Sequence, residues 1–212
     1  MKKLLIFTLF LGFGFALNAQ DGKAKEILNA VSEKTKTYKT IYAKFTSKLI
    51  NQQSGLNESQ SGKIYIKGDK YKIELGDQVV YCNGTKVWTH LKSEGTCYES
   101  YVSEDDDDQI SPSQIFTIWD TGYKYKYVAE KTVNGKKADI IKLFPKDPKE
   151  SKFHTIILTI NKDYSLNTIE IRGKDGTIMK YIVEEMLPNR EMDDSDFVFL
   201  KSKHPGVRVI EN

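Results

Sequence analysis

Apolar and polar side chains alternate with a period of two along most of this chain, and tight turns interrupt the alternation. The first such run covers residues 41–49, and this pattern predicts a half-exposed strand. It predicts further strands near residues 62–67, 71–75, 78–82, 86–91, 96–102, 123–133, 136–144, 153–160, 167–172 and 177–183. Asn83-Gly84 and Asn134-Gly135 separate two of these pairs, and Asn-Gly is the strongest short signal for a hairpin.

Two segments have a helical pattern instead. Residues 21–37 place Ala24, Ile27, Leu28 and Val31 on one face, with Asp21 as a candidate N-cap. The second segment, residues 114–119, is almost wholly apolar. It follows Ser111-Pro112, which suit an N-cap and a first helical position, and Gly122 ends it.

Strands joined in sequence by short turns pair antiparallel, and about ten or eleven of them in one domain must curl. We therefore expect a mainly β (α+β) protein. Residues 20–212 would form one domain, built from a single curved antiparallel sheet or incomplete β-barrel. The helices would lid its concave face, and an apolar space between sheet and helices would be a natural ligand site.

The first 19 residues have the layout of a secretory signal peptide. Lys2 and Lys3 precede an apolar run over residues 4–17, and a small-residue cleavage point falls near Ala19. The run is shorter than the roughly 20 residues needed to span a membrane. We expect residues 1–19 to be removed on export and the mature protein to act in the periplasm.

Charge and cysteine usage narrow the function classes. The formal charge of +3 falls to about +1 without the leader, and the lysines are scattered rather than gathered in the stripe that nucleic-acid binding needs. Cys82 and Cys97 fall on predicted strands separated by a third strand, roughly 9–10 Å apart. That is beyond ordinary disulfide reach, so free buried thiols are expected.

Several short motifs, taken in order, resemble one known family, the LolA-like carriers of outer-membrane lipoproteins. They are Phe45-Thr46, the stretch Ser61-Gly62-Lys63-Ile64-Tyr65-Ile66-Lys67, the hairpin Asn83-Gly84-Thr85-Lys86-Val87-Trp88, Ser111-Pro112, Asp175-Gly176-Thr177, and the close Phe197-Val198-Phe199 with Pro205-Gly206-Val207. Each motif alone is a common turn or strand pattern. The resemblance rests on their order and spacing along the chain. It extends over almost the whole mature chain.

The resemblance implies an open, incomplete β-barrel whose hydrophobic cavity receives lipoprotein acyl chains. We expect no cofactor, no catalysis and a monomeric carrier. The resemblance also implies loading by an inner-membrane ATP-driven release complex and delivery to an outer-membrane acceptor. One departure concerns the lid: where the family has Lys-Arg-Pro, with an Arg similar to a latch, this chain has Lys67-Gly68-Asp69. Lid closure would then rest on apolar contact or on another polar partner.

The alternating apolar positions give the candidate ligand-binding residues. The predicted cavity lining is Phe45, Leu49, Ile64, Ile66, Tyr71, Ile73, Ile156, Leu158, Ile169, Ile171, Tyr181 and Val183. The predicted lid contacts are Ile115, Phe116 and Trp119. A slip of one residue in any strand would reverse the face.

Other functions remain as alternatives. His90, His154 and His204 are scattered without metal spacing, and the sequence has no nucleophile elbow, which disfavours an enzyme. The acidic run at residues 104–108 lacks the order of a calcium loop and is better explained as a solvated loop. A module of the same shape that binds another lipid or a glycolipid, or that senses envelope stress, is the stronger rival.

Overall fold

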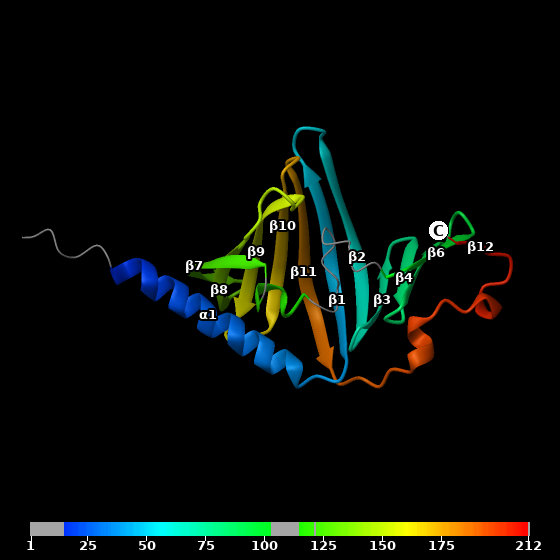
Figure 1. Ribbon diagram of the computed structural model, residues 1–212, viewed down its shortest axis with the longest axis horizontal. Helices are drawn as coiled ribbons and strands as arrows, with labels where there is room; N and C mark the ends of the chain where they lie inside the picture. The colour runs from blue at the N-terminus through cyan, green and yellow to red at the C-terminus, as the bar shows by residue number, and fades with distance from the viewer. Residues whose placement is uncertain (1–14, 103–114, 121, 212) are drawn as a thin grey trace, which may run out of the picture.

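The computed structural model describes the main chain at residues 15–102, 115–120 and 122–211, and side chains from residue 21 onward (Figure 1). In these ranges one α-helix, α1 (Phe15–Lys36), precedes a twelve-stranded sheet. The strands are β1 (Ile41–Asn51), β2 (Leu56–Lys67), β3 (Lys70–Leu75), β4 (Gln78–Cys82), β5 (Lys86–Leu91), β6 (Thr96–Tyr101), β7 (Tyr123–Val133), β8 (Lys136–Pro145), β9 (Phe153–Asn161), β10 (Leu166–Gly173), β11 (Thr177–Pro188) and β12 (Arg208–Glu211). Three single 3-10 turns complete the fold: η1 (Ile118–Asp120), η2 (Asp194–Phe197) and η3 (Lys201–Lys203).

Two meanders make up the sheet, whose strand order is β12-β6-β5-β4-β3-β2-β1-β11-β10-β9-β8-β7. Strands β1 to β6 run outward to one edge, strands β7 to β11 run inward from the other, and β1 pairs with β11 at the centre. The outer strands, β7 and β12, do not pair with each other, so the curved sheet stays open. This confirms the expected mainly β architecture of an incomplete barrel.

The C-terminal strand β12 is the exception to the antiparallel pattern. It pairs parallel with β6, placing Val209 opposite Cys97. Its four residues are too short to show alternation, and it raises the strand count above the expected ten or eleven. A parallel neighbour is possible here because the chain first travels from β11 along the outside of the sheet, through η2 and η3, to reach the far edge.

Helix α1 covers the concave face of β7–β10 (Figure 1). Its apolar face, predicted from residues 21–37, packs on inward-facing residues of these strands. The fully buried strand residues beneath it are Ile141, Leu143, Ile156, Leu158 and Ile160. This half of the sheet therefore has a solid core.

Polar contacts fasten α1 to the sheet in its middle and near its C-terminal end. Lys23 Nζ donates to the Tyr127 hydroxyl at 2.8 Å, and that hydroxyl donates to the buried Asp139 at 3.0 Å. Near the C-terminal end, Lys34 Nζ lies 3.4 Å from a carboxylate oxygen of Asp163. Helix α1 therefore contacts the sheet through both its buried apolar face and its polar side chains.

The C-terminal segment covers the convex face of β4–β6. Phe199 packs there with Val79, Tyr81 and Trp88, and Asp194 pairs with lysines of the β2–β3 turn. The interaction with Lys70 and Lys67 lowers the pKa of Asp194 to about 2. The tail therefore packs on the convex face of this edge of the sheet and does not cover its concave face.

Two of the three histidines meet at this outer contact, contrary to the expectation that all are scattered. The rings of His90 and His204 lie 4.9 Å apart, and both pack against Phe199. They are far apart in sequence but become neighbours because the tail folds back over β5. Over the described ranges, no group of three or more His, Cys, Asp or Glu side chains could hold a metal ion.

Cys82 and Cys97 are both buried and unbonded, on β4 and β6 with β5 between them, as expected. Burial raises the pKa of both thiols, that of Cys97 to about 11. In the part of the chain that is described, no helix combines the length and the apolar character needed to cross a membrane.

Candidate functional site

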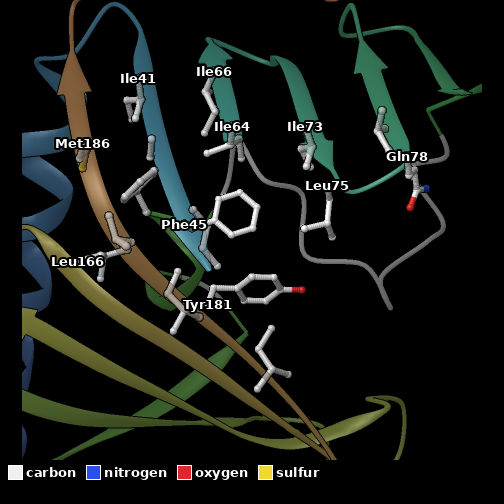
Figure 2. A pocket seen from close by; sticks show the side chains of 17 residues that line it. Ile41, Phe45, Ile64, Ile66, Ile73, Leu75, Gln78, Leu166, Tyr181 and Met186 are labelled. Carbon is white, nitrogen blue, oxygen red and sulfur yellow. The ribbon is translucent and has the colours of Figure 1, made fainter. Parts of the chain in front are cut away.

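A cavity of about 320 Å³ opens on the concave face at the centre of the sheet (Figure 2). Ligand pockets are typically about 300–1,000 Å³, so this one is of usable size. Its walls come from β1–β4, β10, β11 and the start of the segment before β7. The lining residues are Ile41, Ala43, Phe45, Ile64, Ile66, Ile73, Leu75, Gln78, Val80, Ile115, Phe116, Leu166, Ile169, Ile171, Tyr181, Val183 and Met186.

Strand register explains why these side chains share one wall. Directly opposed residues point to the same face of a sheet, and alternate residues do the same along a strand. Ile64 lies opposite Ile73, and Ile73 opposite Val80, so one apolar row crosses β2, β3 and β4. On the other side of β1, Phe45 lies opposite Val183. The cavity wall is therefore a continuous apolar surface rather than a chance gap.

Chain topology brings a cover over this surface. β6 and β7 lie near opposite edges of the sheet, so the chain between them must travel from one edge to the other. Ile115 and Phe116, in the described part of that connection, line the cavity. The connection therefore reaches the cavity, as the prediction of a lid requires.

The described part of this segment is not the expected α-helix. Residues 115–117 form a turn and η1 is one turn of 3-10 helix, in which the Asp120 N–H donates to the Thr117 carbonyl. The Phe116 carbonyl accepts the Ser32 hydroxyl instead of a helical N–H. A contact with α1 thus takes the place of an intrahelical bond. Ser111 and Pro112, the expected helix start, lie outside the described residues.

Ser32 acts as a polar latch between α1 and the segment before β7. It is buried on α1, its hydroxyl donates to the Phe116 carbonyl at 3.2 Å, and it accepts the Trp119 indole N–H at 3.0 Å. Gly68, where the resemblance implies an Arg, has φ +57°, a left-handed conformation that strains side chains. The predicted lid segment, residues 115–120, is held to α1 through Ser32.

Sequence-predicted site residues fall into three groups. Those that line the cavity are Phe45, Ile64, Ile66, Ile73, Ile169, Ile171, Tyr181 and Val183, with Ile115 and Phe116 from the lid segment. Ile156, Leu158 and Trp119 share the right face but belong to the core around α1. Leu49 and Tyr71 also share that face and lie outside the cavity lining. Burial raises the pKa of Tyr71 to about 12, with a contribution from Cys82.

Other lining residues were not among the predicted ones. Ile41, Ala43, Leu75 and Val80 follow the same alternation and could have been included. Met186 breaks it, because a β-bulge near Lys44 shifts the pairing so that Ala43 lies opposite Met186. A strict period of two from Val183 would point residue 185 inward instead.

Aromatic packing shapes the floor of the cavity. Phe45 and Tyr181 meet edge to face, with ring centroids 5.9 Å apart. The Phe45 ring lies over Gly62 on β2, where a Cβ atom would stand 2.5 Å from the ring. Burial raises the pKa of Tyr181, so its hydroxyl stays protonated. Gly62 thus makes room for the ring that forms part of the wall.

Comparison with solved structures shows the fold. An uncharacterized conserved protein from Thermus thermophilus matches with a TM-score of 0.59 at 13% identity, covering 90% of this chain and 99% of that one. The lipoprotein LppX of Mycobacterium tuberculosis matches with a TM-score of 0.50 at 10% identity, covering 82% of this chain and 98% of that one.

Sequence comparison identifies the family. A curated relative, an uncharacterized protein of Methanocaldococcus jannaschii, is 24% identical over 204 residues, which is 93% of this chain but only 58% of the relative. The family model of the outer membrane lipoprotein carrier protein LolA matches residues 18–175, most of the chain. The chain therefore belongs to the LolA family of outer membrane lipoprotein carrier proteins.

Proposed function

We propose that this protein is an exported carrier that holds the acyl chains of lipoproteins in the central cavity. The observation that supports the proposal is the apolar cavity between β1–β4, β11 and Phe116 in a LolA-family chain. Each methylene group exposed to water costs roughly 0.8 kcal/mol. A lipoprotein crossing an aqueous space therefore needs a dry container for its acyl chains.

The proposed route starts with export. Residues 1–19 would act as a cleaved signal peptide, and residues 20–212 would act in the periplasm as one half-barrel domain. An inner-membrane ATP-driven complex would load the carrier, and an outer-membrane acceptor would receive the cargo. Release needs only an acceptor that binds the acyl chains more tightly, so the proposal includes no catalytic step and no cofactor.

Loading would involve the lid segment. Ile115 and Phe116 contact the cavity and can exchange these contacts for contacts with lipid. Trp119, only 3% exposed, would stay in the core around α1 as the anchor of the segment. The moving part of the lid would therefore lie on the Phe116 side of the anchor.

Retention of an acylated lipoprotein in a detergent-free supernatant tests the proposal. Wild type is expected to keep the lipoprotein soluble, and Val183→Asp is expected to lose this activity because it places a carboxylate in the cavity wall. Ile182→Asp is the matched control: it is the adjacent half-buried residue of β11 and faces the convex side. Equal retention by Val183→Asp and wild type would contradict a role of the cavity.

The identity of the cargo needs a second measurement. Mass spectrometry of lipid extracted from the native protein is expected to find acyl chains attached to lipoprotein. Recovery of a glycolipid instead would favour the alternative, a protein of the same fold that binds glycolipid. Recovery of no lipid after purification without detergent would count against a carrier of either kind.

A further inference from the structure

In the described part of the sheet, two lysines stand directly opposite each other on neighbouring strands at four places. These opposed pairs are Lys44 with Lys63, Lys48 with Lys180, Lys67 with Lys70, and Lys126 with Lys142. Opposed side chains have Cβ atoms about 4.5–5.5 Å apart, and like charges in this position destabilise a sheet. An anionic group beside such a pair therefore stabilises it.

Three of the four pairs have a carboxylate of the chain itself beside them. The ion pairs are Lys67 and Lys70 with Asp194, Lys44 with Glu185, and Lys180 with Glu170. The carboxylate of Asp194 bridges its pair, because one oxygen lies 2.9 Å from Lys67 Nζ and the other 2.7 Å from Lys70 Nζ. The protein thus shows how an opposed lysine pair binds a single carboxylate.

The fourth pair, Lys126 on β7 and Lys142 on β8, differs from the other three. Within the described residues, neither ammonium group has an ion-pair or hydrogen-bond partner. Lys126 is exposed, but Lys142 is half-buried, and a half-buried cation without a partner has lost part of its hydration. Lys124, exposed two residues before Lys126 on the same face, adds a third charge. We call Lys124, Lys126 and Lys142 the edge patch.

The edge patch faces away from the cavity, on the convex side of the outermost strand (Figure 1). Tyr125 and Tyr127, which alternate with its lysines on β7, pack against the core under α1 and therefore mark the concave side. Two half-buried apolar side chains flank the patch on the convex face. They are Phe144, opposite Lys124, and Ile157, opposite Lys142.

The C-terminal segment shows which chemistry suits such a surface. Residues 191–199 contain four acidic residues, and Phe197 and Phe199 follow them. Asp194 binds the lysine pair, and five residues later Phe199 packs on Tyr81 and Trp88 of the convex face. One extended segment therefore supplies both a carboxylate for the lysines and an aromatic ring for the neighbouring apolar side chains.

We propose that the edge patch is a docking site for an acidic segment of a partner protein. A carboxylate of that segment would bridge Lys126 and Lys142, and an apolar side chain beside it would pack on Phe144. An anionic membrane suits the patch less well, since membrane docking uses apolar side chains that insert into the bilayer, whereas Phe144 and Ile157 are half-buried. The inference goes beyond the proposed function and does not depend on the cavity.

Titration of isotope-labelled protein with a capped synthetic peptide that has the sequence of residues 191–199 tests the proposal by NMR. The peptide is expected to shift amide signals of β7 and β8 around Lys126 and Lys142, and its affinity should fall as salt is raised. The same peptide with its acidic residues replaced by Asn and Gln should not shift these signals.

Charge reversal tests the named lysines. The double variant Lys126→Glu with Lys142→Glu is expected to weaken peptide binding by about tenfold or more, because two ion pairs are replaced by repulsion. Lys25→Glu with Lys39→Glu is the matched control, since it makes the same change in net charge at two exposed lysines away from the patch. Its affinity should equal that of wild type.

The single variant Lys126→Glu separates binding from folding. It places a carboxylate opposite Lys142, so the melting temperature is expected to rise while peptide binding weakens. A variant that binds poorly because it is damaged would instead melt at a lower temperature.

Three results would overturn the proposal. Shifts confined to the β2–β3 turn and the surroundings of Phe199 would show that the peptide only competes with the chain's own tail. An equal loss in the control variant would show unspecific attraction. Binding to phosphatidylglycerol vesicles that depends on Lys126 and Lys142, with no binding of the peptide, would identify an anionic membrane as the partner instead.

Discussion

The two halves of the concave face have the same sequence pattern and different interiors. Under α1, strands β7–β10 bury Ile141, Ile156 and Leu158 completely. On β2–β4, Ile64, Ile73 and Val80 have the same residue types at the same spacing, yet they are only partly buried and line a cavity. Alternation places a side chain on a face, and what covers the face decides whether it belongs to the core or to the cavity wall.

The covers themselves differ in how they are held. Helix α1 is held by buried apolar residues and by polar contacts at Lys23, in its middle, and at Lys34, near its C-terminal end. The lid segment contacts the cavity through Ile115 and Phe116, and Ser32 holds it. A solid half and a hollow half can therefore coexist in one sheet.

The largest expected effect separates the two halves by stability. Leu158→Ala should cost about 2–5 kcal/mol of unfolding free energy, since it leaves a void under α1. Val80→Ala, in the hollow half, should cost about 1 kcal/mol or less, because its side chain already borders empty space. Urea denaturation measures both. Equal losses would mean that the hollow half is packed as tightly as the solid half.

Removal of the latch should have the next largest effect. Ser32→Ala leaves the buried Trp119 indole N–H without its acceptor, which should cost about 1–3 kcal/mol. Thermal unfolding measures the loss, and the accompanying shift of tryptophan fluorescence to longer wavelength would show that the segment has loosened. Thr35→Ala, one turn further along α1, removes only a bond to the Val31 carbonyl and is the control. A loss no greater than in that control would rule out the latch.

A smaller effect should alter the cavity and leave the solid half unchanged. Gly62→Ala would place a Cβ against the Phe45 ring and push it into the cavity. Unfolding free energy should change by about 1 kcal/mol or less, while affinity for a neutral acyl probe should fall severalfold. Ser61→Ala, exposed on the neighbouring position, should change neither. Adding Phe45→Leu to Gly62→Ala should restore binding, and failure to do so would argue against this geometry.

The smallest effect should come from the convex side, which belongs to neither half. Burial, followed by the charges of His204 and Lys92, lowers the pKa of His90 below its ordinary 6.5, while Asp77 opposes the shift. As pH falls, the His90 imidazole is protonated in the unfolded chain at a higher pH than in the folded chain. Stability from His90 is complete above about pH 6.5 and declines as pH falls through that value toward the folded pKa.

Melting temperature between pH 7 and pH 5 checks this, with His90→Gln expected to flatten the slope. Carboxylates with lowered pKa values, such as Asp194 at about 2, lose their contribution to stability only at much lower pH. They therefore do not affect the slope between pH 7 and pH 5. An unchanged slope in the variant would contradict the role of His90.

The strands and their inward faces could be predicted from sequence because a period of two is a local property. The division of that face into core and cavity could not be predicted from sequence. Ile156 and Ile73 occupy equivalent positions in the alternating pattern, and only the packing of α1 over Ile156 distinguishes them. Met186 was missed because the bulge near Lys44 shifts the alternation.

Strand β12 was missed because its parallel pairing depends on the path of the tail. Ser32 offered a signal, since it follows Leu28 by four residues on the apolar face of α1.

Methyl NMR with labelled isoleucine tests the difference between the two halves most directly. On addition of a neutral acyl ester, intermolecular contacts are expected at Ile64, Ile73 and Ile171, which line the cavity. The methyl groups of Ile141 and Ile160, buried under α1, should show none. Contacts spread over both sets, or confined to the α1 set, would contradict the account of one solid and one hollow half.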